Sequence, residues 1–155
     1  MQGRITIVSL VAAIAGVGTT VAFGAAGAAG PERTITAIAK GTGITFVDAD
    51  RNGKPSLGDY ELGTTVYVKG GKKIGSGSVV CTQTNAAGTH YQCQGLQHFA
   101  GGDLITAGLF SATSKTYAEA ITGGTGVYGG VSGTMNGRWL DARFARAKVV
   151  FTLNG

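Results

Sequence analysis

Apolar and polar side chains alternate along most of the chain, beginning near Thr34. In residues 34–40, one set of side chains points to one face of the backbone, and Ile35, Ala37 and Ala39 point to the other. An alternation with a period of two predicts a β-strand. After residues 41–43, which include two glycines, the apolar segment 44–47 is either a continuation of this strand or a second short strand.

Further strands are predicted where β-branched and aromatic residues lie between short glycine-containing turns. We expect them at residues 64–69, 74–82, 90–99, 103–112, 114–121 and 142–153. Residues 135–141, with the single tryptophan Trp139, are expected to be a connection. No segment shows a convincing helical period, so we count about eight antiparallel strands. The architecture without open edges is an all-β, eight-stranded antiparallel up-and-down barrel, whose interior can hold one small ligand.

A glycine-rich stretch, EAITGGTGVYGGVSGT, occupies residues 119–134. We expect a strand that ends at Ile121, a tight turn at Gly123 and Gly124, and a second strand through Val127 and Tyr128. Glycine weakens a strand unless the backbone has to bend or bulge. The stretch therefore predicts a sharply coiled corner of a closed barrel.

Composition supports one all-β domain behind a secretion signal. The chain has 155 residues with 28 glycines and only 14% charged residues, which is too apolar for disorder and too glycine-rich for a helical protein. Arg4 precedes an uncharged apolar segment, residues 5–23, and small residues follow it. This pattern predicts a signal peptide at residues 1–29 and a secreted domain at residues 30–155. The alternative is an uncleaved membrane anchor.

The charge of the chain does not point to a particular partner. The formal net charge is +5, and removal of Arg4 with the leader lowers it by one, to +4. The remaining basic residues are scattered along the sequence, without the interleaved aromatic residues that single-stranded nucleic acid requires. We therefore expect no nucleic-acid partner and, after signal cleavage, no membrane partner.

Two cysteines, Cys81 and Cys93, are predicted to form a disulfide. An even count behind a secretion signal favours pairing in an oxidising compartment. A turn near residues 85–88 would form a hairpin that places the two cysteines at facing positions. A short loop closed in this way stabilises a protein by about 3 kcal/mol.

An acidic loop, DADRNGKPSLGD at residues 48–59, fits in its first half the calcium-loop pattern D-x-D-x-N-G. The oxygen ligands of Ca²⁺ would come from Asp48, Asp50, Asn52 and Asp59. The loop departs from the pattern because Asp59 replaces the usual Glu, Pro55 lies inside it, and strands flank it. The alternative is a connecting loop whose side chains cap its own backbone. Apart from Ca²⁺ we expect no cofactor.

Motifs for nucleophilic, zinc or phosphate chemistry are absent from the sequence. His90 and His98 are expected at the surface rather than as a pair of metal ligands. Glu119 lies inside an apolar strand beside the glycine-rich turn. It can be a buried acid with a raised pKa, but we expect it on the exposed face of its strand.

An ordered set of motifs resembles the superfamily of allene oxide cyclases and dirigent proteins. The segment AITGGTGVYGGVSG at residues 120–133 is similar to the glycine-rich signature of that superfamily. The same order of further motifs is found in LGD at 57–59, TTVYV at 64–68, IGSGSVVC at 74–81 and KVVFTL at 148–153. The resemblance covers residues 34–153.

The resemblance implies an eight-stranded barrel, often trimeric, with an apolar lumen in which a small molecule is positioned for cyclisation or coupling. It places Cys81 at the position of a lumen cysteine. Thr65 falls where the cyclases have an asparagine that helps to hold a water. The glutamate in the first strand of the cyclases has no match here, so we do not expect the activity of the plant allene oxide cyclases.

The sequence leaves two functions open. The first is a secreted isomerase-like or dirigent-like catalyst that acts on an apolar, lipid-like small molecule, as a homotrimer. Its pocket would be lined by Thr65, Tyr67, Val79, Cys81, Tyr117 and Tyr128. The second is a non-catalytic secreted barrel that binds a ligand or serves as a structural module. An apolar lumen with a lone charged group would favour catalysis, and a filled lumen would exclude a ligand altogether.

Overall fold

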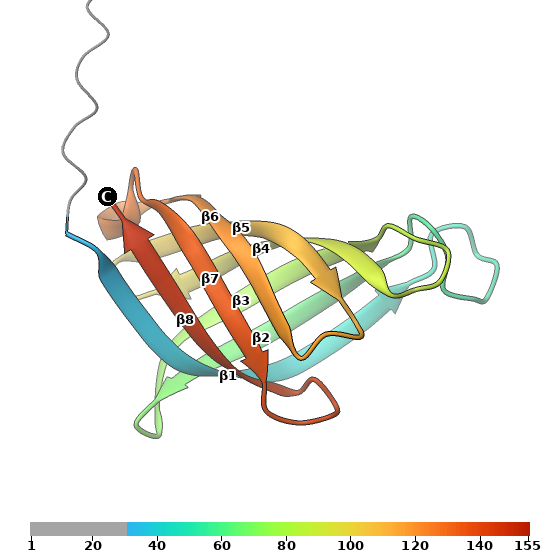
Figure 1. Ribbon diagram of the computed structural model, residues 1–155, viewed down its shortest axis with the longest axis horizontal. Helices are drawn as coiled ribbons and strands as arrows, with labels where there is room; N and C mark the ends of the chain where they lie inside the picture. Colours follow the sequence, from blue (N-terminus) through green and yellow to red (C-terminus); the bar gives the residue numbers. More distant parts are fainter. Residues whose placement is uncertain (1–30) are drawn as a thin grey trace, which may run out of the picture.

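The barrel predicted from the sequence is present in the computed structural model, which describes residues 31–155. The predicted signal peptide at residues 1–29 therefore lies outside the described residues. The strands are β1 (Arg33–Val47), β2 (Tyr60–Lys69), β3 (Lys72–Gln83), β4 (His90–Phe99), β5 (Gly102–Ser111), β6 (Thr116–Gly124), β7 (Ser132–Trp139) and β8 (Arg146–Asn154). Each strand pairs antiparallel with the next, and β1 pairs with β8, which closes the barrel (Figure 1).

The first strand is one long element rather than two short ones. Residues 33–40 of β1 pair with β8, and the segment from Ile38 to Val47 pairs with β2. The register with β2 shifts between Gly41 and Gly43. A bulge of this kind lets a strand bend without ending, so β1 can follow the curved wall from one neighbour to the other.

The glycine-rich stretch has a different structure from the one predicted. Strand β6 runs through Gly123 and Gly124, and Val127 and Tyr128 belong to a 3₁₀ turn, η1 (Gly126–Tyr128), instead of a strand. The predicted tight turn at the two glycines is wrong. Gly124 lies within β6, where two backbone carbonyl groups come too close to leave room for a side chain. A Cβ atom there would lie 2.5 Å from the Asp103 carbonyl oxygen and 2.6 Å from the Tyr128 carbonyl oxygen.

The segment 135–141 is also different from its prediction, because most of it belongs to β7. Met135 is buried and pairs with Phe151 of β8, and Trp139 pairs with Ala147. The apolar residues of β7 alternate with polar ones, but Gly137 interrupts the alternation, and this hides the strand in the sequence. Trp139 is therefore part of the barrel wall.

An aromatic cluster fills one end of the barrel. Its members, called the plug below, are Tyr67, Phe99, Tyr128 and Phe151, and all four are buried. The ring centroids of Phe99 lie 5.3 Å from Tyr67, 5.2 Å from Phe151 and 6.3 Å from Tyr128. Aromatic pairs at such distances stabilise a core by about 0.5–1.5 kcal/mol beyond their buried area. The plug closes the end of the barrel where η1 lies.

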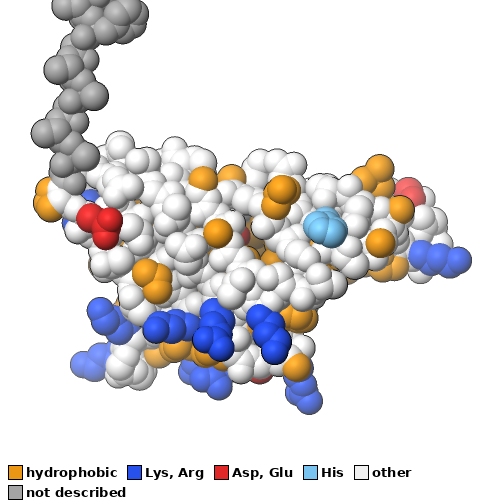
Figure 2. All heavy atoms as spheres, in the orientation of Figure 1, with side chains coloured by type: hydrophobic (Ala, Val, Ile, Leu, Met, Phe, Trp, Pro, Cys, Tyr) orange, Lys and Arg blue, Asp and Glu red, His pale blue; other side chains and the backbone are white. Residues whose placement is uncertain are grey.

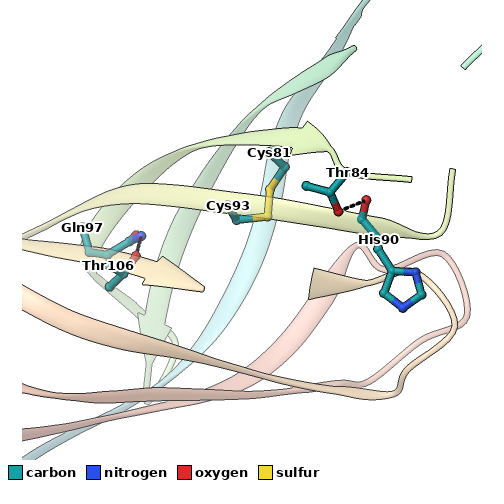
Figure 3. Close-up of a disulfide and its surroundings, with 6 residues drawn as sticks. All are labelled: Cys81, Thr84, His90, Cys93, Gln97 and Thr106. Carbon is teal, nitrogen blue, oxygen red and sulfur yellow. Dashed lines mark hydrogen bonds between the residues drawn. A yellow bond between two sulfur atoms is a disulfide. The ribbon is translucent and has the colours of Figure 1, made fainter. Parts of the chain in front are cut away.

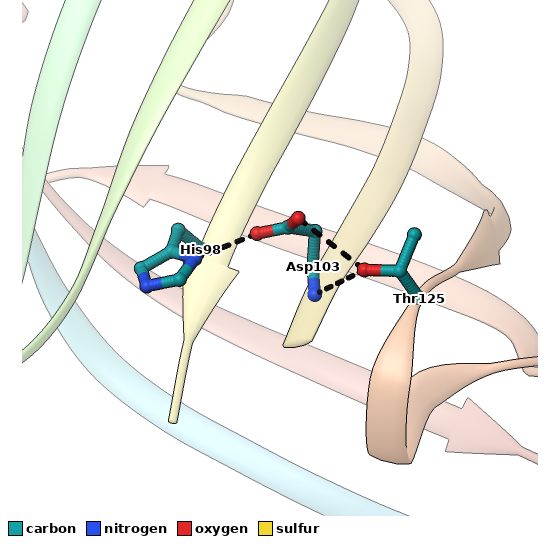
Figure 4. A network of polar contacts seen from close by, with 3 residues as sticks. All are labelled: His98, Asp103 and Thr125. Carbon is teal, nitrogen blue, oxygen red and sulfur yellow. Dashed lines mark hydrogen bonds and ion pairs between the residues drawn. The ribbon is translucent and has the colours of Figure 1, made fainter. Parts of the chain in front are cut away.

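A polar network joins Thr125, the residue before η1, to Asp103 of β5 and His98 of β4 (Figure 4). The Thr125 hydroxyl donates to Asp103 Oδ2 at 3.3 Å and accepts from the Asp103 amide at 3.1 Å, and Asp103 Oδ1 lies 2.7 Å from Nδ1 of the exposed His98. The surface position predicted for His98 is thus confirmed.

Among residues 31–155, no helix has the length and apolarity needed to cross a bilayer.

Basic residues that are scattered in the sequence gather on one face of the barrel. Lys40 of β1 is the cross-strand partner of Arg146, and Lys148 is the partner of Arg138. Figure 2 shows Lys and Arg side chains along the lower side of the molecule. Neighbouring strands therefore bring together basic positions that are far apart in the chain.

The close approach at Gly124 generates a prediction with a matched control. Gly124→Ala places a Cβ against two backbone carbonyls that cannot rotate away, so we expect it to lower the free energy of unfolding by about 1–3 kcal/mol. Gly123→Ala adds the same methyl group one residue earlier, where no atom lies within 4 Å of it. Urea denaturation should show little change for Gly123→Ala; equal effects of the two substitutions would contradict the account.

Candidate functional site

A cavity of about 550 Å³ lies inside the barrel on the open side of the plug. This volume is within the range of small-molecule sites. Strands β1 to β7 contribute to its wall, and the β7–β8 loop contributes Arg143, Phe144 and Ala145 at the mouth. Side chains therefore do not fill the lumen. The filled interior that would exclude a ligand is not found.

The structure brings most of the predicted pocket residues together. Thr65, Tyr67, Val79, Cys81 and Tyr117 line the cavity. Tyr128 does not line it, because the chain at this point forms η1 and the ring is buried in the plug. The binding role of these residues stays a prediction.

A second aromatic cluster forms the wall of the cavity towards the mouth. The ring centroid of Trp139 lies 5.1 Å from Tyr117, 6.1 Å from Phe110 and 5.3 Å from Phe144. Phe110 also lies 6.1 Å from Tyr91. Unlike the plug, this cluster leaves open space beside it, so aromatic faces and edges are available to a flat organic molecule.

Glu119 of β6 lies in the wall of this cavity and not on the exposed face of its strand. Only 9% of the residue is exposed, and the buried Oε2 atom has no hydrogen-bond partner. Burial raises the pKa of the Glu119 carboxyl, and the nearby Thr106 hydroxyl opposes part of that rise. The expectation of an exposed carboxylate is wrong because Glu119 shares the inward face of β6 with Tyr117 and Ile121.

Two tyrosines lie close enough to Glu119 to respond to its charge. Burial raises the pKa of the Tyr67 hydroxyl, and Tyr117 and Glu119 add to the rise. Burial also raises the pKa of Tyr117, with a further contribution from Glu119. Both phenols therefore remain neutral hydrogen-bond donors beside an acidic group.

A buried chain of hydrogen bonds crosses the inner end of the cavity. The Tyr67 hydroxyl donates to Gln97 Oε1 at 2.5 Å, and Gln97 Nε2 donates to Thr106 Oγ1 at 3.2 Å. Figure 3 shows Gln97 and Thr106 joined in this way beside the disulfide. Nothing in the sequence singled out Gln97 or Thr106, because a lone Gln or Thr in a strand is most often exposed.

Two further charged residues line the cavity, Glu61 of β2 and Arg143 of the β7–β8 loop. Burial raises the pKa of Tyr91, and the Glu61 charge adds to the rise. Together with Glu119 these groups give the aromatic cavity a small number of polar contacts, which is the usual composition of a site that orients a ligand.

The predicted disulfide between Cys81 and Cys93 is present (Figure 3). The two residues are directly paired across β3 and β4, as the predicted hairpin requires. Both line the cavity. The thiol that the resemblance places at Cys81 is therefore consumed in a disulfide, and the described residues contain no free cysteine.

The acidic loop brings three carboxylates together. Ligand oxygens of Asp48, Asp50 and Asp59 lie within 4.8 Å of one another. Asn52 Oδ1, the fourth predicted ligand, accepts a hydrogen bond from the Lys54 amide at 2.8 Å.

The same carboxylates also cap the backbone of the loop. Asp48 accepts from the Gly53 amide at 2.7 Å, and Asp59 accepts from the Ala49 amide at 2.8 Å. Desolvation alone would raise the pKa of Asp50, but hydrogen bonds led by Ser56 hold it below its ordinary value. Calcium binding stays a prediction, and a melting temperature that is equal in Ca²⁺ and in chelator would exclude it.

A second depression, of about 660 Å³, lies on the outer wall over β5 to β8. Arg138 and Lys148 border it, and Leu109 and Val150 form part of its floor. It has no buried acid, so the lumen is the better candidate for chemistry.

Comparisons with known proteins find similarity in structure only. No protein-family model matches the chain, and no curated protein matches its sequence. Pyocyanin demethylase is similar in structure, with a TM-score of 0.67, 25% identity, and coverage of 78% of this chain and 99% of that chain.

Two further solved structures show the same architecture. The pterocarpan synthase dirigent protein PsPTS1 has a TM-score of 0.65 and 18% identity, over 82% of this chain and 96% of its own. The Diels-Alderase AbmU from Streptomyces koyangensis has a TM-score of 0.63 and 17% identity, over 77% of this chain and 63% of its own. The chain therefore has the closed eight-stranded barrel fold of the allene oxide cyclase and dirigent kind.

Proposed function

We propose that the lumen binds a small, largely aromatic organic molecule and steers its cyclisation, coupling or isomerisation, with Glu119 as the acid–base group. The observation that carries this proposal is a buried carboxyl with an unpartnered oxygen in the wall of an aromatic cavity. A buried carboxyl without a partner costs stability, and such groups cluster at functional sites.

The environment of Glu119 suits proton transfer. A carboxyl with a raised pKa is a stronger base once ionised, and a general base works best when its pKa is close to the working pH. The neutral phenol of Tyr117 can donate a hydrogen bond to developing negative charge on a substrate. The aromatic wall holds a flat molecule in one orientation, which supplies positioning.

The structural neighbours support a small organic substrate. Their names describe a demethylase of pyocyanin, a pterocarpan synthase and a Diels-Alderase. The wall formed by Trp139, Tyr117 and Phe110 in this chain suits an aromatic molecule better than a flexible acyl chain. The alternative, a barrel that binds such a molecule without converting it, shares the cavity but gives no role to Glu119.

We also propose secretion and assembly as a homotrimer. The disulfide is in keeping with an oxidising compartment. The outer wall of β2 to β5 exposes apolar side chains on paired positions, Leu62 with Val80 and Leu96 with Ile105. Sedimentation velocity at the mass of one chain would contradict the trimer.

The proposed binding site predicts a contrast between two neighbouring valines. Val79 lines the lumen, whereas Val80 is exposed on the outer wall. Because Trp139 is the single tryptophan and lies in the cavity wall, a bound aromatic molecule should quench its fluorescence. With pyocyanin and phenazine as probes, Val79→Phe should weaken saturable quenching at least about tenfold by filling the cavity. Val80→Phe should bind as the wild type does; loss of binding in both variants, or in neither, would contradict the site.

The buried acid predicts a stability that depends on pH. The folded-state pKa of Glu119 lies above its ordinary value of 4.5. The native state therefore holds the proton more tightly than the unfolded state, so stability is lost as pH rises from the ordinary pKa through the folded one. Glu119→Gln, which stays neutral, should match the wild type in melting temperature below about pH 4 and exceed it near pH 7.

The control for this substitution is Glu32→Gln, the same chemical change at an exposed residue before β1. It should leave the melting temperature unchanged at both pH values. With a converted substrate, Glu119→Gln should lower turnover at least about 100-fold while probe binding persists. Full turnover in Glu119→Gln would contradict the acid–base role of Glu119.

A further inference from the structure

The side chain of Gln97 has a place in the lumen that packing does not explain. It is 4% exposed, and its amide lies between Tyr67 of β2 and Thr106 of β5. Burying a primary amide costs free energy, and an apolar side chain of similar length would fill the same space without that cost. The hydrogen bonds that Gln97 makes therefore have to account for its place in the lumen.

The donors and acceptors of these two hydrogen bonds determine where the Thr106 hydroxyl proton can point. Because the Tyr67 hydroxyl donates to Gln97 Oε1, the amide presents its Nε2 hydrogens to Thr106. Thr106 Oγ1 accepts from Gln97, so its single proton is left for another acceptor. Thr106 is fully buried, and Glu119 is the acidic group that its hydroxyl influences. Thr106 lies two residues before Gly108, the cross-strand partner of Glu119, so its hydroxyl faces the same part of the lumen as the carboxyl whose buried Oε2 has no partner.

Two glycines hold the amide of Gln97 in this orientation. A Cβ atom on Gly77 would collide with Gln97 Oε1, and one on Gly95 would collide with Gln97 Nε2. Gly77 and Gly95 lie on either side of the amide, on β3 and β4. The amide oxygen of Gln97 therefore packs against the backbone of Gly77, and the amide nitrogen packs against the backbone of Gly95.

We propose that Gln97 is a positioning residue for Glu119: by donating to Thr106 Oγ1, it turns the Thr106 hydroxyl proton towards the Glu119 carboxylate. This inference rests on the proposed acid–base role of Glu119. With Gln97 in place, the ionised carboxyl accepts one fixed donor and keeps one orientation in the cavity wall. Without Gln97, the Thr106 hydroxyl is free to rotate and can accept a hydrogen bond from neutral Glu119, which favours the protonated carboxyl.

Other titratable or charged groups that face the cavity can also affect the titration of Glu119. Burial, with a contribution from the charge of Glu119, raises the pKa values of Tyr67 of β2 and Tyr117 of β6, so both stay neutral as Glu119 ionises. Glu61 and Arg143 line the same cavity nearer its mouth. A substitution at Gln97 also removes the acceptor of the Tyr67 hydroxyl, so the shift in the Glu119 midpoint is measured again in a Tyr67→Phe background, where a persisting shift reports on Thr106.

The test is an infrared titration of the protonated carboxyl band in the complete protein, without substrate. The band of Glu119 is assigned by its loss in Glu119→Gln. Gln97→Met removes the amide at nearly constant volume, and we expect it to raise the Glu119 midpoint by about half a pH unit. Thr106→Val removes the donor itself and should raise the midpoint by about one unit. The matched control is Gln94→Met, the same change at an exposed position of β4.

The titration midpoints of the variants distinguish whether Gln97 positions Thr106 or Thr106 acts alone. A midpoint that rises in Gln97→Met and Thr106→Val but not in Gln94→Met supports the positioning role. A rise in Thr106→Val alone overturns it, because Thr106 then acts without Gln97. If Gln97→Met does not fold, Gly77→Ala, whose Cβ would collide with Gln97 Oε1, should displace the amide and produce the same rise, and an unchanged midpoint overturns the inference. Absence of turnover with an intact titration shift would instead count against the proposed function alone.

Discussion

The narrow interior of an eight-stranded barrel is the constraint on which the site depends. Such a barrel has room for little more than one layer of inward side chains, so a large inward residue needs a neighbour with almost no side chain. Glycine is the cross-strand partner of several inward polar or aromatic residues, in the pairs Gly77–Gln97, Gly95–Thr106, Gly108–Glu119 and Gly137–Tyr117. The plug follows the same rule, because Gly75 is the cross-strand partner of both Tyr67 and Phe99. The glycines therefore provide the space that the core and the site both require.

This arrangement separates the parts that stabilise the fold from the parts that can do chemistry. The plug, the closure of β1 against β8 and the Cys81–Cys93 disulfide stabilise the barrel. Gln97 and Glu119, in contrast, are polar groups in a buried place, which lowers stability unless their hydrogen bonds are complete. Natural proteins keep such groups where function needs them. The stable plug at one end lets the other end carry an incompletely satisfied acid.

The fold could be predicted from alternation and turn residues, but several site features could not. The period of two identified most strands, and it failed at β7 because Gly137 interrupts the pattern. Glu119 had a detectable signal, since it alternates with Tyr117 and Ile121, yet a single carboxylate in a strand is usually exposed. The role of Gln97 and the basic face depend on the register between strands, which no single segment of sequence contains. The disulfide was predictable because its hairpin is local.

A crystal structure of the protein with a bound aromatic probe such as phenazine tests the central claim most directly. The account predicts that the probe lies in the lumen beside Trp139 and Tyr117, with a ring nitrogen within hydrogen-bond distance, about 2.6–3.2 Å, of the Glu119 carboxyl. A probe bound only in the outer depression at Arg138 and Lys148, or a lumen closed by rearranged side chains, would contradict it.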